Sequence, residues 1–352
     1  MEAIQVDESV RAQARLLDLS SAFITPMALK CAVELRIADI INSHGGGPIT
    51  LSQIASGITG SSCPNISHLE RLMRLLVHKT IFTAHHPSDG GETLYGLTDI
   101  SRWIVWDAKP SLAPFVLTRT NPLTLPTWHA LSQCIRDGGI AFEKVNGCQL
   151  WDFASTNPEF NKLFNDGSSS TIEILMSRFL PAYKDGFSTI GTLVDVGGGT
   201  GRTLFEIVKS HPHIRGINFD LPHVIATAPN HERVTHIGGD MFQAIPTGDA
   251  ILMKSMLCAY NDETNVQILK KCRKAIPENI GKLIIVDVVI EEENNNIFKE
   301  SKIMLDLVMM TFFSGKQRTE AEWKKLLKEG GFPRYNIIKI PAVEWIIEAY
   351  PI

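Results

Sequence analysis

The stretch 193–201, LVDVGGGTG, brings together residue types that suit the binding of a nucleoside-like ligand. Its apolar start predicts a short buried strand, and residues 202–210 have the apolar spacing of a helix. Between the two lies a tight turn made by Gly197, Gly199 and Gly201. Such a strand–turn–helix unit presents bare backbone N–H groups to a ligand at the start of the helix.

An acid beyond the turn, Asp220, stands where a doubly wound sheet places a carboxylate that accepts hydrogen bonds from ribose hydroxyls. A dinucleotide site needs G-x-G-x-x-G, but Arg202 occupies the position of the third glycine. No phosphate-binding lysine follows the glycines, which excludes a P-loop. The residues therefore favour S-adenosylmethionine (SAM), a nucleoside cofactor without phosphate; a plain glycine turn is the alternative.

Length and composition limit the function further. The chain has 352 residues, enough for two domains, and its 44% hydrophobic and 20% charged residues are typical of a soluble globular protein. Its net charge of −4, with both signs interspersed, predicts no nucleic-acid binding. The acidic-polar start and the short apolar runs predict neither a signal peptide nor a membrane span, so we expect a cytoplasmic protein. Six scattered cysteines indicate reduced thiols rather than disulfides or a metal site.

The first 110 residues have the pattern of a winged helix that is used for packing. Residues 8–42 are expected to be helical and unusually apolar, which is typical of a helix buried against a second subunit or domain. A helix that begins after Thr50, a second helix at 68–77 and a hairpin within 82–98 follow. The stretch lacks a recognition helix rich in Lys and Arg, so we expect dimerisation rather than DNA binding.

From residue 191 onward, strands and helices alternate, which predicts a doubly wound α/β domain. The candidate strands are 193–196, 216–219, 234–237, 250–253, 283–289 and 335–340, with helices at 261–275 and 320–328. The predicted organisation is a winged-helix dimerisation domain at 1–110, a helical connector that contributes to the substrate pocket at 111–190, and a Rossmann-like SAM-binding domain at 191–352.

Several motifs together resemble one family. LVDVGGGTG is followed by FDLPHV at 219–224, GDMF at 239–242, MK at 253–254 and GKQRT at 315–319. With these motifs the chain closely resembles, nearly end to end, the plant small-molecule O-methyltransferases of the caffeic acid, flavonoid and norcoclaurine type. The resemblance implies SAM as cofactor, S-adenosylhomocysteine as product, a homodimer, and a small aromatic or alkaloid substrate, with no metal, nucleic acid or membrane involved.

The resemblance also implies roles for individual residues. Asp220 would hold the ribose, Asp240 and Met241 the adenine, and Lys254 would lie near the methionine portion of the cofactor. The full set of implied cofactor residues is Asp195, Gly197, Gly199, Gly201, Asp220, Leu221, Asp240, Met241, Phe242 and Lys254. The implied acceptor pocket contains Trp128, Phe153, Phe164, Ser168, Met176, Met309, Met310 and Phe313, and core packing is the alternative for the methionines.

The chain departs from the family pattern where the general base should stand. The family has a histidine a few residues after the lysine, and this chain has Cys258 there, followed by Ala259 in place of an acid. The acid that follows Gly-Lys and orients the histidine is replaced by Gln317. Of the acids that support the base, only the third survives, in shortened form, as Asp287.

This departure concerns proton transfer. A phenol has a pKa of about 10, and a positioned base contributes roughly 10²–10⁴-fold to the rate of a reaction that must remove its proton. A cysteine, with an ordinary pKa of about 8.5, is mostly protonated at neutral pH, and Gln317 carries no charge to activate it. We therefore do not expect Cys258 to replace the histidine directly. His129 is a candidate substitute base, with a structural role as the alternative.

Three functions stay open at this point. The chain transfers a methyl group to oxygen or nitrogen of an acceptor that needs no strong base. Alternatively, it retains SAM as a fixed positive charge and acts as a cyclase, dehydratase or pericyclase. The third possibility is a catalytically silent dimer partner or metabolite-binding protein.

Overall fold

The computed structural model describes residues 7–60, 63–291 and 296–351. The chain forms two compact units, and α11 (Pro158–Tyr183) contributes to both. The first unit comprises Met1–Leu125 and Glu159–Thr171, and the second comprises Pro126–Pro158 and Ile172–Ile352. The predicted connector at 111–190 thus supplies residues to each unit.

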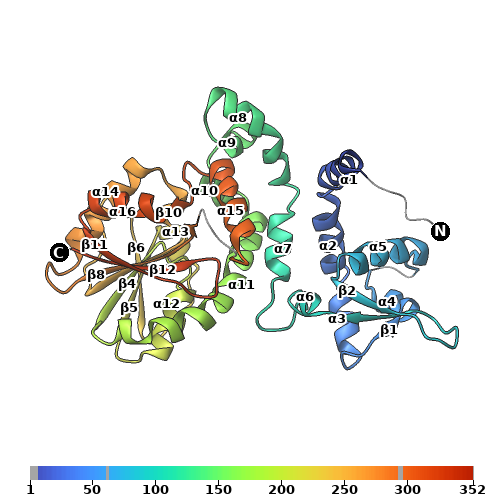
Figure 1. Cartoon of the computed structure of the whole chain (residues 1–352). Coiled ribbons are helices and arrows are strands. Elements are labelled where there is room, and N and C mark those ends of the chain that lie inside the picture. The colour runs from blue at the N-terminus through green and yellow to red at the C-terminus, as the bar shows by residue number, and fades with distance from the viewer. Residues whose placement is uncertain (1–6, 61–62, 292–295, 352) are drawn as a thin grey trace. The chain divides into compact units, whose positions relative to one another are not determined.

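The first unit is mainly helical, with a small antiparallel sheet (Figure 1). The stretch predicted as one helical region forms three helices, because the chain turns at 21–23 and Arg36 has a left-handed backbone with φ of 56°. The predicted hairpin is present, and its second strand pairs on both sides, in the order β1-β3-β2. The elements are α1 (Glu8–Ser20), α2 (Ile24–Glu34), α3 (Ile37–Ser43), β1 (Ile49–Thr50), α4 (Leu51–Gly57), α5 (Ile66–His78), β2 (Phe82–His85), β3 (Leu94–Leu97), α6 (Asp99–Arg102) and α7 (Ala113–Arg119).

Local sequence signals explain where these helices begin. The Thr50 side chain accepts a hydrogen bond from the backbone N–H of Gln53, whose own side chain accepts one from the N–H of Thr50. This reciprocal pair satisfies two backbone donors that a helix start leaves open, which confirms Thr50 as the predicted N-cap. On α5, buried Leu69, Met73 and Leu76 follow the helical spacing expected from the sequence.

The second unit begins with short helices and continues as a sheet covered by helices (Figure 1). Its helices are η1 (Leu125–Ala130), α8 (Leu131–Asp137), α9 (Ala141–Asn146), α10 (Leu150–Thr156), η2 (Lys184–Phe187), α12 (Arg202–Ser210), α13 (Pro222–Ile225), η3 (Leu257–Ala259), α14 (Asp262–Ala275), α15 (Lys299–Phe312) and α16 (Glu320–Glu329). Its strands are β4 (Thr192–Val196), β5 (Arg215–Asp220), β6 (Val234–Gly238), β7 (Ala250–Lys254), β8 (Lys282–Asp287), β9 (Val289–Ile290), β10 (Arg318–Thr319), β11 (Arg334–Ile338) and β12 (Trp345–Tyr350).

The seven-stranded sheet has the order β11-β12-β8-β7-β4-β5-β6. Strands β4 to β8 run parallel to one another, and β12 is antiparallel to both β8 and β11. The strand order reverses at β4, which lies between β7 and β5, and ligands of doubly wound sheets bind at such a switch point. The glycine turn follows β4 at this position.

Two features of the sheet differ from the sequence prediction. The strand predicted at 283–289 ends at Asp287, and the residues after it form β9, which pairs with β10 instead. Strand β12 has no counterpart among the predicted strands, because its apolar residues are buried on both faces and show no alternation. The core of the unit lies around β8, where Leu283, Ile284 and Ile285 are fully buried.

Candidate cofactor and acceptor site

The glycine turn after β4 needs glycine for two separate reasons. Gly197, Gly199 and Gly201 have positive φ values of 73°, 60° and 84°, which L-residues rarely adopt. A Cβ on Gly197 would also lie 2.4 Å from the sulfur of Met256. No atom lies within 4 Å of a Cβ position built on Gly199, so the turn has open space there.

Asp220, at the carboxyl end of β5, is bound to this turn. Its Oδ2 accepts a hydrogen bond from the N–H of Gly199 at 2.8 Å, and its Oδ1 accepts one from the N–H of Leu221 at 2.7 Å. Each carboxylate oxygen retains a lone pair for a further donor. The structure thus brings together the turn and the acid that the sequence predicts to share one ligand.

Asp195, in β4, lies beneath the turn and is only 1% exposed. Neither of its carboxylate oxygens has a hydrogen-bond partner among the described residues. Burial raises the pKa of Asp195 to about 7; the positive charge of Lys254 opposes this shift and the negative charge of Asp220 adds to it. A buried carboxylate without a donor is costly, so this position suits a ligand that supplies a donor or a positive charge.

The predicted adenine-binding residues lie after β6. The carboxylate of Asp240 accepts a hydrogen bond from the N–H of Phe242 at 2.8 Å, and the Phe242 ring stands edge-on to Tyr260 with centroids 5.7 Å apart. Burial, followed by the charges of Asp220 and Asp240, raises the pKa of Tyr260. The charges of both acids thus act on Tyr260; sequence reasoning missed this residue, although it directly follows Cys258 and Ala259.

These residues fit a nucleoside sulfonium. The open space over Gly199 leaves room for a ligand. The remaining lone pairs of Asp220 can accept hydrogen bonds from ribose hydroxyls, and the unpartnered carboxylate of Asp195 suits a positive charge. The half-exposed side chains of Leu221 and Phe242, which are 41% and 38% exposed, offer apolar surface next to the acids. No group of metal-binding side chains exists among the described residues.

Cys258, in η3, lies against Asp287 at the end of β8. Its N–H donates to Oδ2 of Asp287 at 3.3 Å, and its thiol also hydrogen-bonds this carboxylate. Burial, with the charge and hydrogen bond of Asp287, raises the pKa of the Cys258 thiol well above its usual range. Burial likewise raises the pKa of Asp287 to about 6, against the N–H of Val288 and the charge of Arg318. The thiol is therefore a proton donor within the protein and not a free base.

The GKQRT segment closes over this pair. A Cβ on Gly315 would lie 1.9 Å from the carbonyl oxygen of Cys258, so only glycine permits this approach. The N–H of Gln317 donates to Asp306 at 2.7 Å, and its buried Oε1 has no partner among the described residues. The side chain at this position is thus an uncharged amide.

Arg318, which is fully buried, holds the loop that contains Cys258. Its guanidinium donates to the carbonyl oxygens of Leu257 and Tyr260 at 2.9 and 3.0 Å, and to the carboxylate of Asp262 at 2.9 and 2.7 Å. Sequence reasoning missed this role, because a single arginine in a motif gives no sign of which distant carbonyls it binds. These hydrogen bonds all go to oxygens of the protein, so we assign Arg318 a structural role in fixing the loop.

Several predicted acceptor residues meet in an aromatic cluster of the second unit. Trp128 stands edge-on to Phe312 with centroids 5.7 Å apart, and Phe142 contacts Phe153 at 5.4 Å and Phe312 at 5.7 Å. Phe313 lies 5.6 Å from Trp151. The sequence analysis assigns Trp128, Phe153 and Phe313 to the pocket but omits Phe312, which is next to Phe313 at the end of α15.

The other predicted acceptor residues are distributed more widely. Met309 is buried on α15 and Met310 is 38% exposed, whereas Met176 packs in the hydrophobic core of the second unit. Phe164 and Ser168 belong to the first unit, where Phe164 lies 6.1 Å from Phe160. His129, the candidate substitute base, is exposed on η1.

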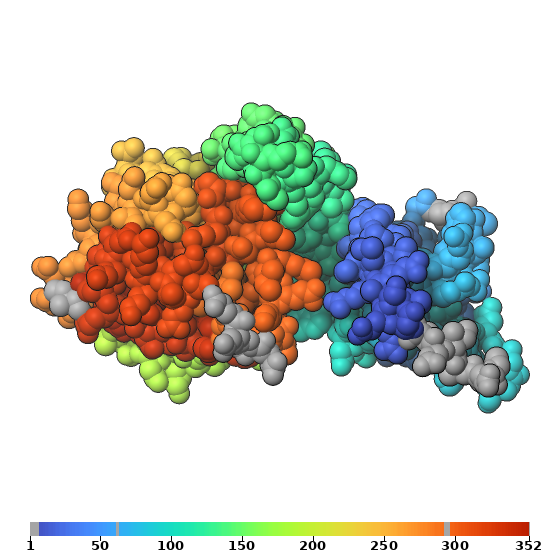
Figure 2. All heavy atoms as spheres, turned by 45° about the horizontal axis from the view of Figure 1, so that its top comes forward, coloured from blue at the N-terminus to red at the C-terminus, as the bar shows by residue number. Residues whose placement is uncertain are grey.

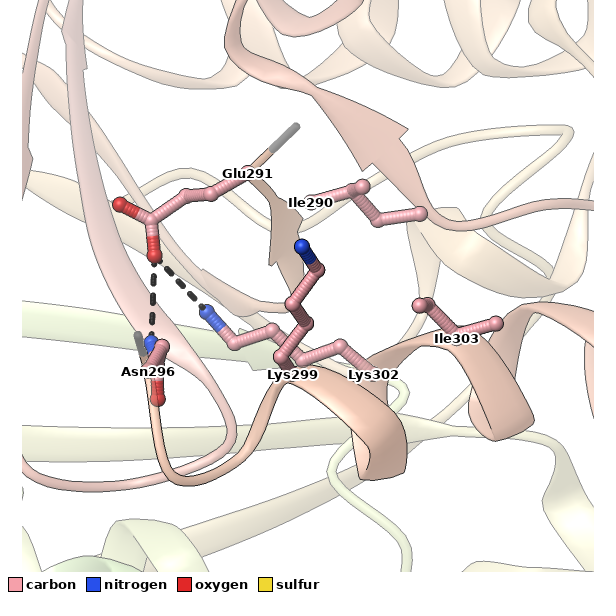
Figure 3. Close-up of a pocket in the computed structure, with 6 residues that line it drawn as sticks. All are labelled: Ile290, Glu291, Asn296, Lys299, Lys302 and Ile303. Atoms are coloured by element: carbon pink, nitrogen blue, oxygen red, sulfur yellow. Dashed lines mark hydrogen bonds and ion pairs between the residues drawn. The ribbon is translucent and has the colours of Figure 1, made fainter. Parts of the chain in front are cut away.

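A small pocket lies apart from all these residues, between β9 and the start of α15 (Figure 3). In it, Glu291 accepts a hydrogen bond from Asn296 at 3.1 Å and lies 3.9 Å from Lys302. Lys302 also donates to the carbonyl oxygen of Val289 at 3.0 Å and stands over the Trp345 ring. These contacts attach α15 to the sheet; none of the predicted site residues lines the pocket.

A glycine turn at the switch point of a doubly wound sheet, with a ribose acid on the next strand, defines an α/β enzyme that binds a nucleoside cofactor. A family model described as an O-methyltransferase domain matches residues 128–333, and one described as an O-methyltransferase dimerisation domain matches residues 17–107. The chain belongs to the O-methyltransferase family, whose cofactor is SAM. The predicted family, fold class and cofactor are thereby confirmed.

Similar proteins cover nearly the whole chain. It is 52% identical to desmethylxanthohumol 6'-O-methyltransferase of Humulus lupulus, over 97% of this chain and 99% of that protein. It is 48% identical to (R,S)-reticuline 7-O-methyltransferase of Papaver somniferum, over 98% of this chain and 99% of that protein. The crystal structure of human N-acetylserotonin methyltransferase in complex with SAM is similar in fold, with a TM-score of 0.85 over 99% of both chains at 20% identity.

Proposed function

We propose that this SAM-dependent methyltransferase methylates a small aromatic acceptor whose reacting oxygen is already ionised, an acidic phenol. The observation that supports this is the state of Cys258 at the position of the family's base. Its thiol is buried, hydrogen-bonded to Asp287 and held protonated, since its pKa is raised well above the usual range. Because no side chain at this position accepts a proton, the acceptor must arrive without one.

The cofactor end of the site is intact and supports methyl transfer. When bound, SAM supplies an electrophilic methyl group on a sulfonium. The carboxylate of Asp220 would accept hydrogen bonds from the ribose, Asp240 and Met241 would contact the adenine, and Lys254 would lie near the methionine portion. Buried Asp195 favours positive charge nearby, because its two oxygens have no donor among the described residues.

An aromatic acceptor fits the second unit's cluster of rings. Trp128, Phe312 and Phe313 offer ring faces and edges for stacking against a flat ligand. The similar proteins of Humulus lupulus and Papaver somniferum are named for methylating desmethylxanthohumol and reticuline. We infer a phenolic or alkaloid acceptor of the same general kind, and alignment of its oxygen with the methyl group would supply much of the rate.

The proposal is tested with phenols of graded acidity. At pH 8, lowering the phenol pKa from about 10 to about 7 raises the ionised fraction roughly 100-fold, and the rate with labelled SAM should follow this fraction. Equal rates across the series would contradict an ionised acceptor. Conversion of an acceptor without consumption of SAM would favour the SAM-retaining cyclase, dehydratase or pericyclase, and binding without any turnover would favour a silent partner.

Restoring the family residues should recreate a base. The triple variant Cys258→His, Ala259→Asp, Gln317→Glu is expected to methylate ordinary phenols at least tenfold faster, towards the roughly 10²–10⁴-fold that a positioned base contributes. The variant Cys258→Ser is the control, since its hydroxyl supplies no base. The measurement is kcat for a phenol of ordinary pKa. If kcat does not rise, the acceptor pocket, and not the missing base, limits the methylation of such phenols.

We also infer a homodimer formed through the dimerisation domain. The segment that contains α1 and α2 lies at the surface of the first unit, in dark blue in Figure 2. The apolar side chains of Leu16, Leu17 and Leu19 on α1 and of Phe23 just before α2 are each more than half exposed. In the described residues no single helix is long and apolar enough to cross a bilayer; only α1 and α2 together, bent by 41°, reach that length and composition. Light scattering at micromolar concentration tests the dimer.

The cysteines support a reducing compartment. Five of the six cysteines, Cys31, Cys134, Cys148, Cys258 and Cys272, are free thiols. Since disulfides form in oxidising compartments, we propose that the protein functions in the cytoplasm. Imaging of a fluorescent fusion tests this location.

A further inference from the structure

Two residues outside the site motifs, Asn218 and His236, are linked by hydrogen bonds to the carbonyl group of Gly199. Asn218, in β5, donates from Nδ2 to the carbonyl oxygen of Gly199 at 2.9 Å and to Nδ1 of His236 at 3.1 Å. His236, in β6, in turn lies 3.0 Å from the carbonyl oxygen of Pro229 through Nε2. The three contacts form one chain of hydrogen bonds, from Pro229 to the glycine turn.

The strand register explains why these side chains meet. Asp195 in β4 pairs with Asn218 in β5, which pairs with His236 in β6, so the three form one row across parallel strands. Residues in register on neighbouring strands point to the same face of the sheet. Asn218 is fully buried, and its Oδ1 would lie 2.2 Å from a Cβ on Gly198. The row therefore supports the turn directly.

The donors and acceptors in this chain can be assigned. A carbonyl oxygen only accepts, so Gly199 requires the amide nitrogen of Asn218 on its side. The second hydrogen of that nitrogen points to Nδ1 of His236, which must then be unprotonated. The proton of a neutral imidazole is left on Nε2, where it donates to Pro229. These three hydrogen bonds thus have matching donors and acceptors in one tautomer of His236, while the Oδ1 of Asn218 has no partner among the described residues.

The same glycine peptide groups hold the ribose acid. The N–H of Gly199 donates to Oδ2 of Asp220 at 2.8 Å while its carbonyl accepts from Asn218, so both sides of this residue are fixed at a φ of 60°. If the carbonyl is released, the left-handed conformation loses a constraint, and the carboxylate of Asp220 loses its orientation with it.

We propose that Asn218 and His236 are positioning residues for the cofactor, which set the affinity for SAM through the orientation of Gly199 and Asp220. The inference rests on the glycine turn as the cofactor site. It predicts an effect on cofactor binding and KM rather than on kcat, because the hydrogen bonds of the two residues reach Gly199 and Pro229.

Two substitutions of His236 test separately its hydrogen bond with Asn218 and its hydrogen bond with Pro229. In His236→Asn the amide oxygen takes the place of Nδ1 and still accepts from Asn218. In His236→Gln the amide nitrogen takes the place of Nε2, which retains the contact to Pro229 and removes the acceptor for Asn218. The matched control is His213→Gln, since His213 also contacts a carbonyl oxygen, that of Phe187 at 3.1 Å, away from the turn.

The test measures binding of S-adenosylhomocysteine by calorimetry, KM for SAM, kcat, and the thermal midpoint of the unliganded dimer. We expect His236→Gln to weaken binding and raise KM about tenfold, the effect of one buried hydrogen bond, with kcat within twofold. His236→Asn and His213→Gln should bind within about twofold of the wild type.

Several outcomes would overturn the proposal. Equal affinities of His236→Asn and His236→Gln for S-adenosylhomocysteine would show that the contact between Asn218 and His236 does not set cofactor affinity. A decrease in only kcat or only the thermal midpoint would show the same. Failure of the wild-type protein to bind S-adenosylhomocysteine would instead remove the assignment of the glycine turn as the cofactor site. Because Asn218 is fully buried, Asn218→Asp is informative only in folded protein, and there we expect more than a tenfold loss.

Discussion

Two buried carboxylates in neighbouring regions of the sheet have opposite surroundings. Asp195 at the cofactor end and Asp287 at the base end are each 1% exposed, and burial raises the pKa of both, to about 7 and about 6. Asp195 has no donor among the described residues, whereas Asp287 accepts from the N–H groups of Cys258 and Val288 and from the Cys258 thiol. One region is prepared for a ligand, and the other is already satisfied by the protein.

The comparison separates the surroundings of the predicted cofactor site from those of Cys258, the residue at the predicted base position. The cofactor end keeps an unpaired acid next to a glycine turn with open space. At the base end, a small thiol fills the position and uses the surviving acid as its own hydrogen-bond acceptor. The carboxylate of Asp287 is thus occupied by hydrogen bonds within the protein. Under the proposed function, it is not available to take a proton from the methyl-accepting substrate.

The largest expected effect is a loss of stability when Arg318, which holds the loop of Cys258, is replaced. Arg318→Leu should lower the free energy of unfolding by about 3–5 kcal/mol, because it removes the buried positive charge that pairs with Asp262. It also removes one donor each from the carbonyl oxygens of Leu257 and Tyr260, which keep their hydrogen bonds from Asn265. Urea unfolding measures the change. The control is Arg74→Leu at an exposed ion pair with Glu70, where we expect less than about 0.5 kcal/mol. Similar values for both would mean that Arg318 does not hold the loop.

The next prediction concerns pH and the unpaired acid. The pKa of Asp195 is raised from 3.8 to about 7, so the folded state keeps its proton where the unfolded state loses it. Stability should therefore fall as pH rises from about 4 to about 7, and Asp195→Asn should remove this fall, with a gain on the order of 3 kcal/mol at pH 8. Unfolding of the unliganded protein across pH checks this; identical pH profiles would show that the acid is not strained.

A third change sharpens the role of the cofactor end. Asp220→Asn should weaken binding of S-adenosylhomocysteine about 100-fold, because a carboxylate that can accept two ribose donors becomes an amide that still has to satisfy Gly199. Calorimetry gives the affinity, and Asp249→Asn, at the other end of the sheet, is the control because Asp249 accepts hydrogen bonds from the N–H groups of Gly191 and Thr192, away from the glycine turn. An unchanged affinity would place the ribose elsewhere.

The smallest expected effect tests the thiol. Cys258→Ser should change kcat for an acidic phenol by less than about threefold, since serine also donates to Asp287 and neither side chain is a base. Steady-state kinetics with SAM measures it. A loss of 100-fold or more would make the thiol a participant in catalysis and would end the contrast between the two regions.

Where neighbours in the chain form the candidate site, the sequence predicts which of its residues lie together. The turn after 193–196 and the acid at Asp220 lie on consecutive strands, so periodicity and glycine spacing suffice to bring them together. The replacement at Cys258 is likewise visible from residue types alone. The aromatic cluster is predicted in part, since Phe312 and Phe142 have no property in the sequence that separates them from other core rings.

The amino-acid sequence by itself determined the family and the α/β architecture, and it predicts the cofactor motif and Cys258 in the place of the expected histidine, because each depends on local spacing and residue type. The tertiary structure decided the partners of each buried polar group: that Asp287 serves the Cys258 thiol, that Asp195 has none among the described residues, that Arg318 binds the loop, and that the Asn218–His236 pair supports Gly199. Hydrogen bonds between residues far apart in the chain depend on strand register and packing, and a one-dimensional pattern does not contain these distances.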